Sequence, residues 1–141
     1  MNILKLILAT CVVLMIACSC SNKAIVNTSD VEKISFKRVE LNEVLSHPEH
    51  YNQVNVDIIG YAAFGFEVTG LFLDNQSAAK IRTENGLWLV PDSSMSNGQR
   101  EFIVEKCNGK KVRVKGLIDS KEQGHLNAYK AQVKIKYLEI L

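Results

Sequence analysis

The histidines are the side chains in this sequence whose type and spacing could support chemistry. His47 and His50 flank Pro48 three residues apart, and two imidazoles on one turn can bind a transition metal. The sequence shows no third ligand beside them, so it predicts no metal site. His125 lies in a Gly-His-Leu segment, where it could act as a ligand contact or a general base. We favour the alternative that its imidazole hydrogen-bonds to the backbone and fixes a turn.

Neither the carboxylates nor the sequence motifs indicate catalysis. Glu49, Asp57 and Glu67 form no recognisable acid–base pair, and solvated carboxylates are the default. No serine-hydrolase, zinc-protease, P-loop or dinucleotide-binding motif is present. The length of 141 residues, net charge of +2, 47% hydrophobic and 23% charged content exclude a multidomain enzyme and a disordered polyelectrolyte. The sequence therefore predicts no enzyme, no catalytic residue and no cofactor.

Positive charge gathers near the C-terminus. Residues 106–136 hold nine Lys and Arg against two Asp and Glu, whereas residues 18–105 hold seven against twelve. Lys111, Arg113 and Lys115 alternate, so they would share one face of a strand, and Lys134 and Lys136 would share another. Such a basic stripe would suit an anionic ligand, although alternating Lys is also typical of a solvated strand face.

Aromatic side chains offer a second kind of ligand contact, because their rings can stack on a ligand. The available ones are Tyr61, Phe64, Phe66, Phe72 and Trp88. The predicted ligand-binding residues combine aromatic rings, the cationic strand and one imidazole: Tyr61, Phe64, Trp88, Lys111, Arg113, Lys115 and His125.

The N-terminus is typical of a signal peptide over residues 1–17. Lys5 precedes an apolar run over residues 6–17, which is shorter than the roughly 20 residues that a membrane-spanning helix needs. Met15-Ile16-Ala17-Cys18 resembles the lipobox of bacterial lipoproteins, in which the Cys thiol receives diacylglycerol and the chain is cut before it. The resemblance implies lipidation of Cys18. Cys20 is a weaker alternative, and a plain secretory signal cut near Ala17 is another.

Lipidation would set the compartment and the partners. Cys18 is followed by Ser-Cys-Ser-Asn-Lys, without an acidic residue, which by resemblance to bacterial lipoproteins favours an outer-membrane anchor facing the periplasm. Several acyl chains hold a small domain on a bilayer. The expected partners are then the membrane, an anionic envelope component or a protein, and nucleic acid is a poor fit. Cys20 and Cys107 could pair in an oxidising periplasm, but free thiols are favoured.

The remaining sequence predicts a tether and one domain. Residues 18–33 are small, polar and aperiodic, as expected of a flexible tether before a domain at 34–141. Glu40–Ser46 has helical spacing and ends before Pro48. Residues 75–83 are expected to form a helix or loop, and 99–106 a helix. Five segments have the apolar and polar pattern of short strands: Val54–Ile58, Val68–Leu73, Leu87–Val90, Lys111–Ile118 and Ala131–Leu138.

Five short strands with glycine bends predict a closed barrel, because closure removes exposed strand edges. Segments 45–56, 67–73, 85–89, 108–116 and 124–126 resemble a family of small bacterial proteins with an OB-fold-like barrel, over about residues 39–140. The resemblance implies a mainly β fold, a five-stranded OB-like closed barrel with a short N-terminal helix. It implies no activity.

These patterns together predict an envelope-anchored lipoprotein that acts as a non-enzymatic binding or interaction module. An immunity-type or inhibitor protein, directed against an envelope toxin or hydrolase, is the alternative. A hydrolase that uses His125 is the third and least favoured.

Overall fold

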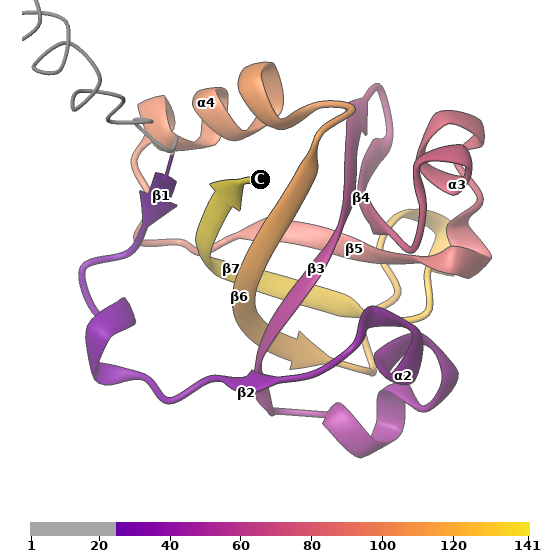
Figure 1. The fold of residues 1–141 in the computed structure, drawn as a ribbon, viewed down its shortest axis with the longest axis horizontal. Coiled ribbons are helices and arrows are strands. Elements are labelled where there is room, and N and C mark those ends of the chain that lie inside the picture. Colours follow the sequence, from indigo (N-terminus) through magenta and orange to yellow (C-terminus); the bar gives the residue numbers. More distant parts are fainter. Residues whose placement is uncertain (1–24) are drawn as a thin grey trace, which may run out of the picture.

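The computed structural model describes residues 25–141 (Figure 1). The predicted signal peptide, Cys18 and Cys20 lie outside the described residues, so lipidation of Cys18 and a free Cys20 thiol stay predictions. Cys107 is a free, buried cysteine. Within residues 25–141, no helix combines the length and the hydrophobicity that crossing a membrane would require.

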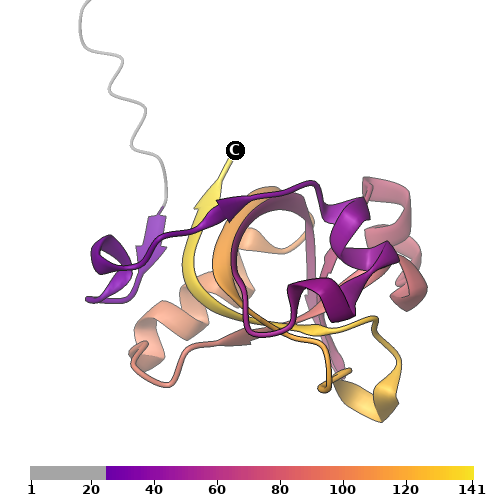
Figure 2. The ribbon, with the colours of Figure 1, turned by 90° about the horizontal axis from the view of Figure 1, so that it is seen from below.

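Five strands form a closed ring of hydrogen-bonded neighbours. They are β3 (Asn55–Gly65), β4 (Val68–Phe72), β5 (Gly86–Pro91), β6 (Lys111–Asp119) and β7 (Gln132–Ile140). The antiparallel pairs are β3 with β4, β4 with β5, β3 with β6, and β6 with β7, while β5 and β7 run parallel. The ring follows β3, β4, β5, β7 and β6 back to β3, and its curvature is visible in Figure 2. The five predicted strands are thereby confirmed.

Strand β3 is longer than its sequence pattern indicated, because Gly60 continues the strand instead of bending out of it. Residues 55–61 pair with β6 and residues 61–65 pair with β4, so one strand serves both halves of the ring. A Cβ atom at Gly60 would lie 2.8 Å from the Leu71 side chain and 2.8 Å from the carbonyl oxygen of Phe72. Only glycine permits this close approach of the two strands.

Three helices accompany the strands and make the domain a small, strand-rich mixed α/β fold, not the mainly β fold that was expected. They are α2 (Leu41–Ser46), α3 (Asn75–Lys80) and α4 (Asn97–Cys107). Helix α2 was predicted and buries Leu41, Val44 and Leu45. Helix α4 begins at a reciprocal Ser96–Gln99 cap. Four 3-10 helices complete the fold: η1 (Val31–Lys33), η2 (Pro48–Tyr51), η3 (Thr83–Asn85) and η4 (His125–Asn127).

The main core lies inside the ring, where alternate strand residues meet. Its fully buried strand residues are aliphatic, and each stabilises the fold by roughly 1.5–3 kcal/mol relative to exposure: Val56, Ile58, Leu71, Leu87, Leu89, Val112, Val114, Ile118, Val133, Ile135 and Leu138. The residues between them point to the outer face, so the outer face of the ring is where a candidate site must be sought.

Residues 25–33 correct the predicted tether. They form β1 (Ile25–Asn27), which pairs antiparallel with β7, followed by η1. Val26 is only 5% exposed and belongs to the main core. Strand β2 (Lys37–Arg38) then pairs parallel with β3. Strands of two or three residues carry too little periodicity to be recognised from sequence.

Candidate functional site

The three predicted cationic residues share the outer face of β6, as their alternation indicated, but one of them is enclosed in an ion network. Arg113 donates from Nε to Asp57 Oδ1 at 2.8 Å and from Nη2 to Asp57 Oδ2 at 2.5 Å. Arg38, from β2, donates to the same carboxylate at 2.8 Å. Asp57 is 6% exposed, so its charge must be balanced within the fold.

The electrostatics of Asp57 agree with this geometry. Burial alone would raise the pKa of the Asp57 carboxyl, but the hydrogen bonds and charges of Arg113 and Arg38 outweigh burial and lower that pKa. The same hydrogen bonds raise the pKa of Arg113. Both groups are therefore charged at neutral pH, and the charge of Arg113 is directed to Asp57 and not to a ligand.

Two further cations of the basic stripe, Lys115 and Lys136, also have partners. The Lys115 ammonium lies 4.8 Å from the centroid of the Tyr137 ring and 5.8 Å from that of Phe36. Lys136 Nζ lies 2.9 Å from Asp30 Oδ2 and 3.1 Å from Asp92 Oδ2. Three of the five cations of the expected stripe thus contact other groups of the fold, and binding of an anion by the stripe stays a prediction.

Tyr61 and Lys111 are the two predicted residues that the structure does bring together. They face each other across β3 and β6 and line a shallow hollow of about 450 Å³ that Ile59 and Leu73 also line. Of the predicted ligand-binding residues, one aromatic and one cationic side chain line the hollow, so these residues offer a ligand few contacts there.

The predicted aromatic face is closed. Phe64 points into the main core, and Tyr61 and Trp88 pack on a separate small cluster of Phe72, Ala78 and Tyr129. The Trp88 and Tyr129 ring centroids lie 5.1 Å apart in an edge-on arrangement.

The loop between β6 and β7 covers this cluster. A Cβ atom at Gly124 would lie 2.5 Å from the Trp88 ring, and Gly124 has φ +68. Burial raises the pKa of Tyr129, and the neighbouring Thr69 amide offsets part of that rise. Trp88 consequently serves packing and is not displayed for stacking.

Two hydrophobic side chains that the prediction omitted are strongly exposed instead. Phe66, in the turn between β3 and β4, is 91% exposed, and Leu126, in η4, is 85% exposed. The other exposed large hydrophobic side chains among the described residues reach at most 51%. Leu126 itself has a left-handed backbone conformation, with φ 55. Phe66 precedes Glu67, which also has one, with φ 59.

A histidine and a carboxylate bring the two loops close together. His125 Nε2, in the loop between β6 and β7, lies 3.6 Å from Glu67 Oε2, in the turn between β3 and β4. Phe66 is next to Glu67 in the sequence, and Leu126 is next to His125. We call Phe66, Glu67, His125 and Leu126 the loop edge. A two-residue turn between strands points its side chains outward, and this signal could have found Phe66 from the sequence. Leu126 has no comparable signal.

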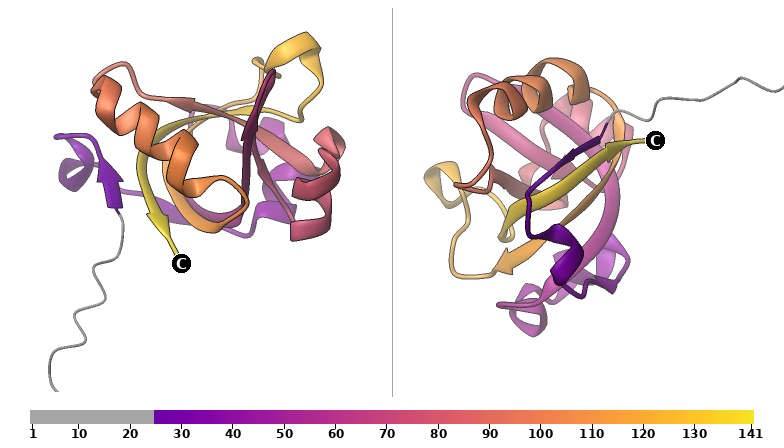
Figure 3. Two further views of the ribbon diagram at one scale, coloured as in Figure 1. Left: turned by 90° about the horizontal axis from the view of Figure 1, so that it is seen from above. Right: turned by 90° about the vertical axis from the view of Figure 1, so that its left-hand side faces the viewer.

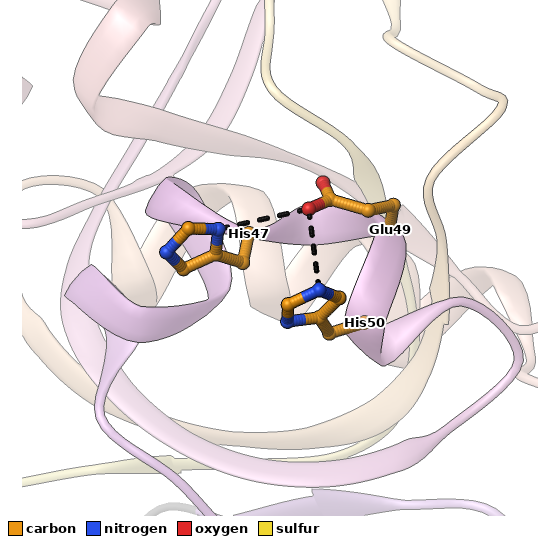
Figure 4. A group of neighbouring side chains, drawn as sticks. All are labelled: His47, Glu49 and His50. Atoms are coloured by element: carbon orange, nitrogen blue, oxygen red, sulfur yellow. Dashed lines mark ion pairs between the residues drawn. The ribbon is translucent and has the colours of Figure 1, made fainter.

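A third cluster lies at the end of α2. His47 Nδ1 and His50 Nε2 each lie 3.6 Å from Glu49 Oε1, and the two rings stack with centroids 5.1 Å apart (Figure 4). All three side chains are exposed. Glu49 is the third ligand that the sequence did not reveal, because its position between the two imidazoles depends on the turn.

Comparisons with known proteins give distant structural likenesses alone. No family model matches the sequence, and no curated protein matches it. A solved structure of a protein assigned as an aspartyl-tRNA synthetase from Leishmania major Friedlin is similar, with a TM-score of 0.46 and 13% identity. The match covers 75% of this chain and 21% of that one, so the chain spans about a fifth of the length of that protein. Nothing about function follows from this likeness.

Proposed function

We propose that the protein is a bacterial envelope lipoprotein, anchored through Cys18, whose domain is an OB-like closed barrel acting as a non-enzymatic binding module. Its partner is a protein, and the contact is made by the loop edge. The lipobox-like sequence before Cys18 supports the anchor. The closed ring of five strands, with α4 between β5 and β6, supports the barrel.

The exposure of Phe66 and Leu126 is the observation that carries the proposed contact. Phe66 and Leu126 are large apolar side chains on neighbouring loops, and both are exposed to water. Burying their surface against a partner would stabilise the complex by about 25 cal/mol per Å² of apolar area. Aromatic and aliphatic anchors beside charged groups are typical of the energetic centre of a protein interface. An anionic partner is less well supported, because Arg113, Lys115 and Lys136 already have partners in the fold.

The position of the loop edge suits a module held at a membrane. Strand β1, where the described chain begins, lies on one side of the domain, and the loop between β6 and β7 lies on the other (Figures 1 and 3). A domain tethered through its N-terminus would therefore present the loop edge away from its anchor.

The arrangement of ionisable groups supports a non-enzymatic role. The pKa shifts of Asp57, Asp92 and Lys136 follow from contacts within the fold. Asp57 pairs with Arg113 and Arg38. Asp92 pairs with Lys136, which also pairs with Asp30. His125 meets a single carboxylate, Glu67, on the rim of two loops, and both side chains are substantially exposed. A general base needs a substrate pocket around it, and neither side chain lines one of the larger hollows.

An inhibitor of an envelope toxin or hydrolase is a second candidate that the same edge favours. The left-handed backbone at Glu67 and Leu126 restricts the conformations of the two loops before binding, and His125 lies close to Glu67. Such preorganisation lowers the entropic cost of binding, as in inhibitors that insert a rigid loop into a cleft.

Site-specific photo-crosslinking in cells tests the contact. A photoreactive amino acid placed at position 66 or 126 of the full chain is expected to crosslink to the same protein. Position 104, an exposed hydrophobic residue on α4, is the matched control and is expected to give no such product. Equal amounts of crosslinked product at positions 66, 126 and 104, or no crosslinked product at 66 and 126, would rule out the loop edge as the contact surface for a partner protein. A captured hydrolase or toxin whose activity the protein blocks would favour the inhibitor.

A further inference from the structure

We infer that His47, Glu49 and His50 form a binding site for a divalent transition-metal ion, with Zn²⁺ as the best-suited ion. The ligand atoms are His47 Nδ1, His50 Nε2 and a carboxylate oxygen of Glu49, which all lie within 4.8 Å of one another. The site is separate from the loop edge and does not depend on the proposed contact there.

The local backbone explains why these side chains converge. Pro48 ends α2 and opens η2, and His47 belongs to the end of one helix and the start of the other. The His50 amide donates to the His47 carbonyl at 3.1 Å and closes the turn. In a 3-10 turn, the side chains of residues three apart lie above each other, so His47 and His50 stack. The turn thus holds the two imidazoles side by side, and binding of one ion requires the exposed rings to rotate so that the lone pairs in their planes converge.

The distances fit a metal better than they fit a direct ion pair. Each nitrogen lies 3.6 Å from Glu49 Oε1, which is too long for a hydrogen bond of good geometry. Two ligand atoms that are each about 2.0–2.1 Å from Zn²⁺ at a tetrahedral angle lie about 3.3–3.4 Å apart. The two nitrogen–carboxylate distances are within a few tenths of an ångström of this value. The two ring nitrogens lie within 4.8 Å of each other and must approach more closely, which rotation of the exposed side chains allows. Figure 4 shows the carboxylate of Glu49 facing both ring nitrogens.

The donor set selects the class of ion. Two imidazoles and one carboxylate suit Zn²⁺, Cu²⁺ or Ni²⁺ better than Mg²⁺ or Ca²⁺, which prefer oxygen ligands. Three protein ligands leave at least one coordination position for water or for a group from another molecule. Because all three side chains are exposed, the ion can enter without opening the fold.

Cobalt titration of the full chain tests the site, because Co²⁺ replaces Zn²⁺ and absorbs visible light when bound. The protein is purified in detergent without a polyhistidine tag and carries Cys20→Ser to remove a competing thiol. We expect one Co²⁺ per chain, displaced by one Zn²⁺. His47→Ala, His50→Ala and Glu49→Gln are expected to weaken binding at least about tenfold.

His125→Ala is the matched control, since His125 is the third of three histidines in the chain and lies in the loop edge. It should bind Co²⁺ within about twofold of the unsubstituted protein. Fluorescence of Trp88 checks that every variant is folded. The inference is wrong if saturable binding of one ion is absent, or if a folded His50→Ala variant binds as tightly as the unsubstituted protein.

Discussion

Asp57 shows that one carboxylate can bind a cation that the sequence pattern assigned to a ligand. Alternation along β3 puts it on the outer face, where a solvated side chain is the ordinary expectation. One short strand that the sequence does not reveal, β2, brings Arg38 to it, and the predicted strand β6 brings Arg113. The sequence supplied the cationic residues and their shared face, but the pairing of those cations depends on strand register.

Asp92 gives a prediction at the residue scale that concerns pH. Burial would raise its pKa, but hydrogen bonds from Ser94 and Lys136 outweigh burial and lower the pKa to about 2, from its ordinary value of 3.8. A depressed carboxyl pKa contributes stability that is present above the unfolded-state pKa and is lost as the pH falls through the folded-state pKa. The loss therefore falls between about pH 4 and pH 2.

Comparison with Asp92→Asn by chemical denaturation measures this contribution. The gap in free energy of unfolding between the two proteins should shrink by about 2 kcal/mol from pH 5 to pH 2. A gap that stays constant over that interval would show that Lys136 and Ser94 do not stabilise the ionised carboxylate.

Elements whose pattern spans several residues were predictable, and the shorter ones were not. The five strands and α2 follow from alternating or helical spacing, because burial of one face imposes that spacing on the sequence. Strand β1 buries one side chain, Val26, and leaves Ile25 and Asn27 exposed, so its composition resembles that of a linker. Its strand conformation is imposed by pairing with β7.

Val26→Ala tests whether β1 belongs to the folded domain. Removing two buried methyl groups from the core is expected to lower the free energy of unfolding by about 2 kcal/mol. Ile25→Ala, at an exposed neighbouring position, is the control and should change it by less than about 0.5 kcal/mol. The free energies of unfolding are measured by urea denaturation. If both substitutions changed this free energy equally and negligibly, residues up to 33 would behave as the flexible tether that the sequence predicted.

Gly124→Ala tests whether the loop between β6 and β7 closes over the aromatic cluster. The backbone at Gly124 has φ 68 and ψ −155, a conformation nearly restricted to glycine, and an added Cβ would meet the Trp88 ring. We expect the loop to move away and the fluorescence of Trp88, the single Trp of the chain, to shift to longer wavelength.

A matched glycine substitution separates this effect from a general one. Gly98→Ala, in the first turn of α4, places a Cβ no closer than 4.0 Å to its neighbours and should leave Trp88 fluorescence unchanged. An unchanged spectrum in Gly124→Ala would mean that Gly124 does not hold the loop against Trp88.

At the scale of the whole molecule, the aromatic rings that the sequence suggested for binding pack inward, and the exposed hydrophobic pair lies elsewhere. Composition and spacing identify Phe66 and Trp88 alike as aromatic residues near strand ends. Which of them is covered depends on the path of a loop more than thirty residues away in sequence, and no local pattern records that contact. The fold was therefore more predictable than the surface that it presents.

The membrane anchor is the central claim on which the choice of compartment and of partner rests, and the mass of the native N-terminus tests it most directly. Mass spectrometry of the protein extracted from membranes should find a mature chain that begins at Cys18, with its thiol bearing diacylglycerol. A chain that retains residues 1–17, or one whose Cys18 carries no lipid, would contradict the account and remove the reason for seeking its partner in the envelope.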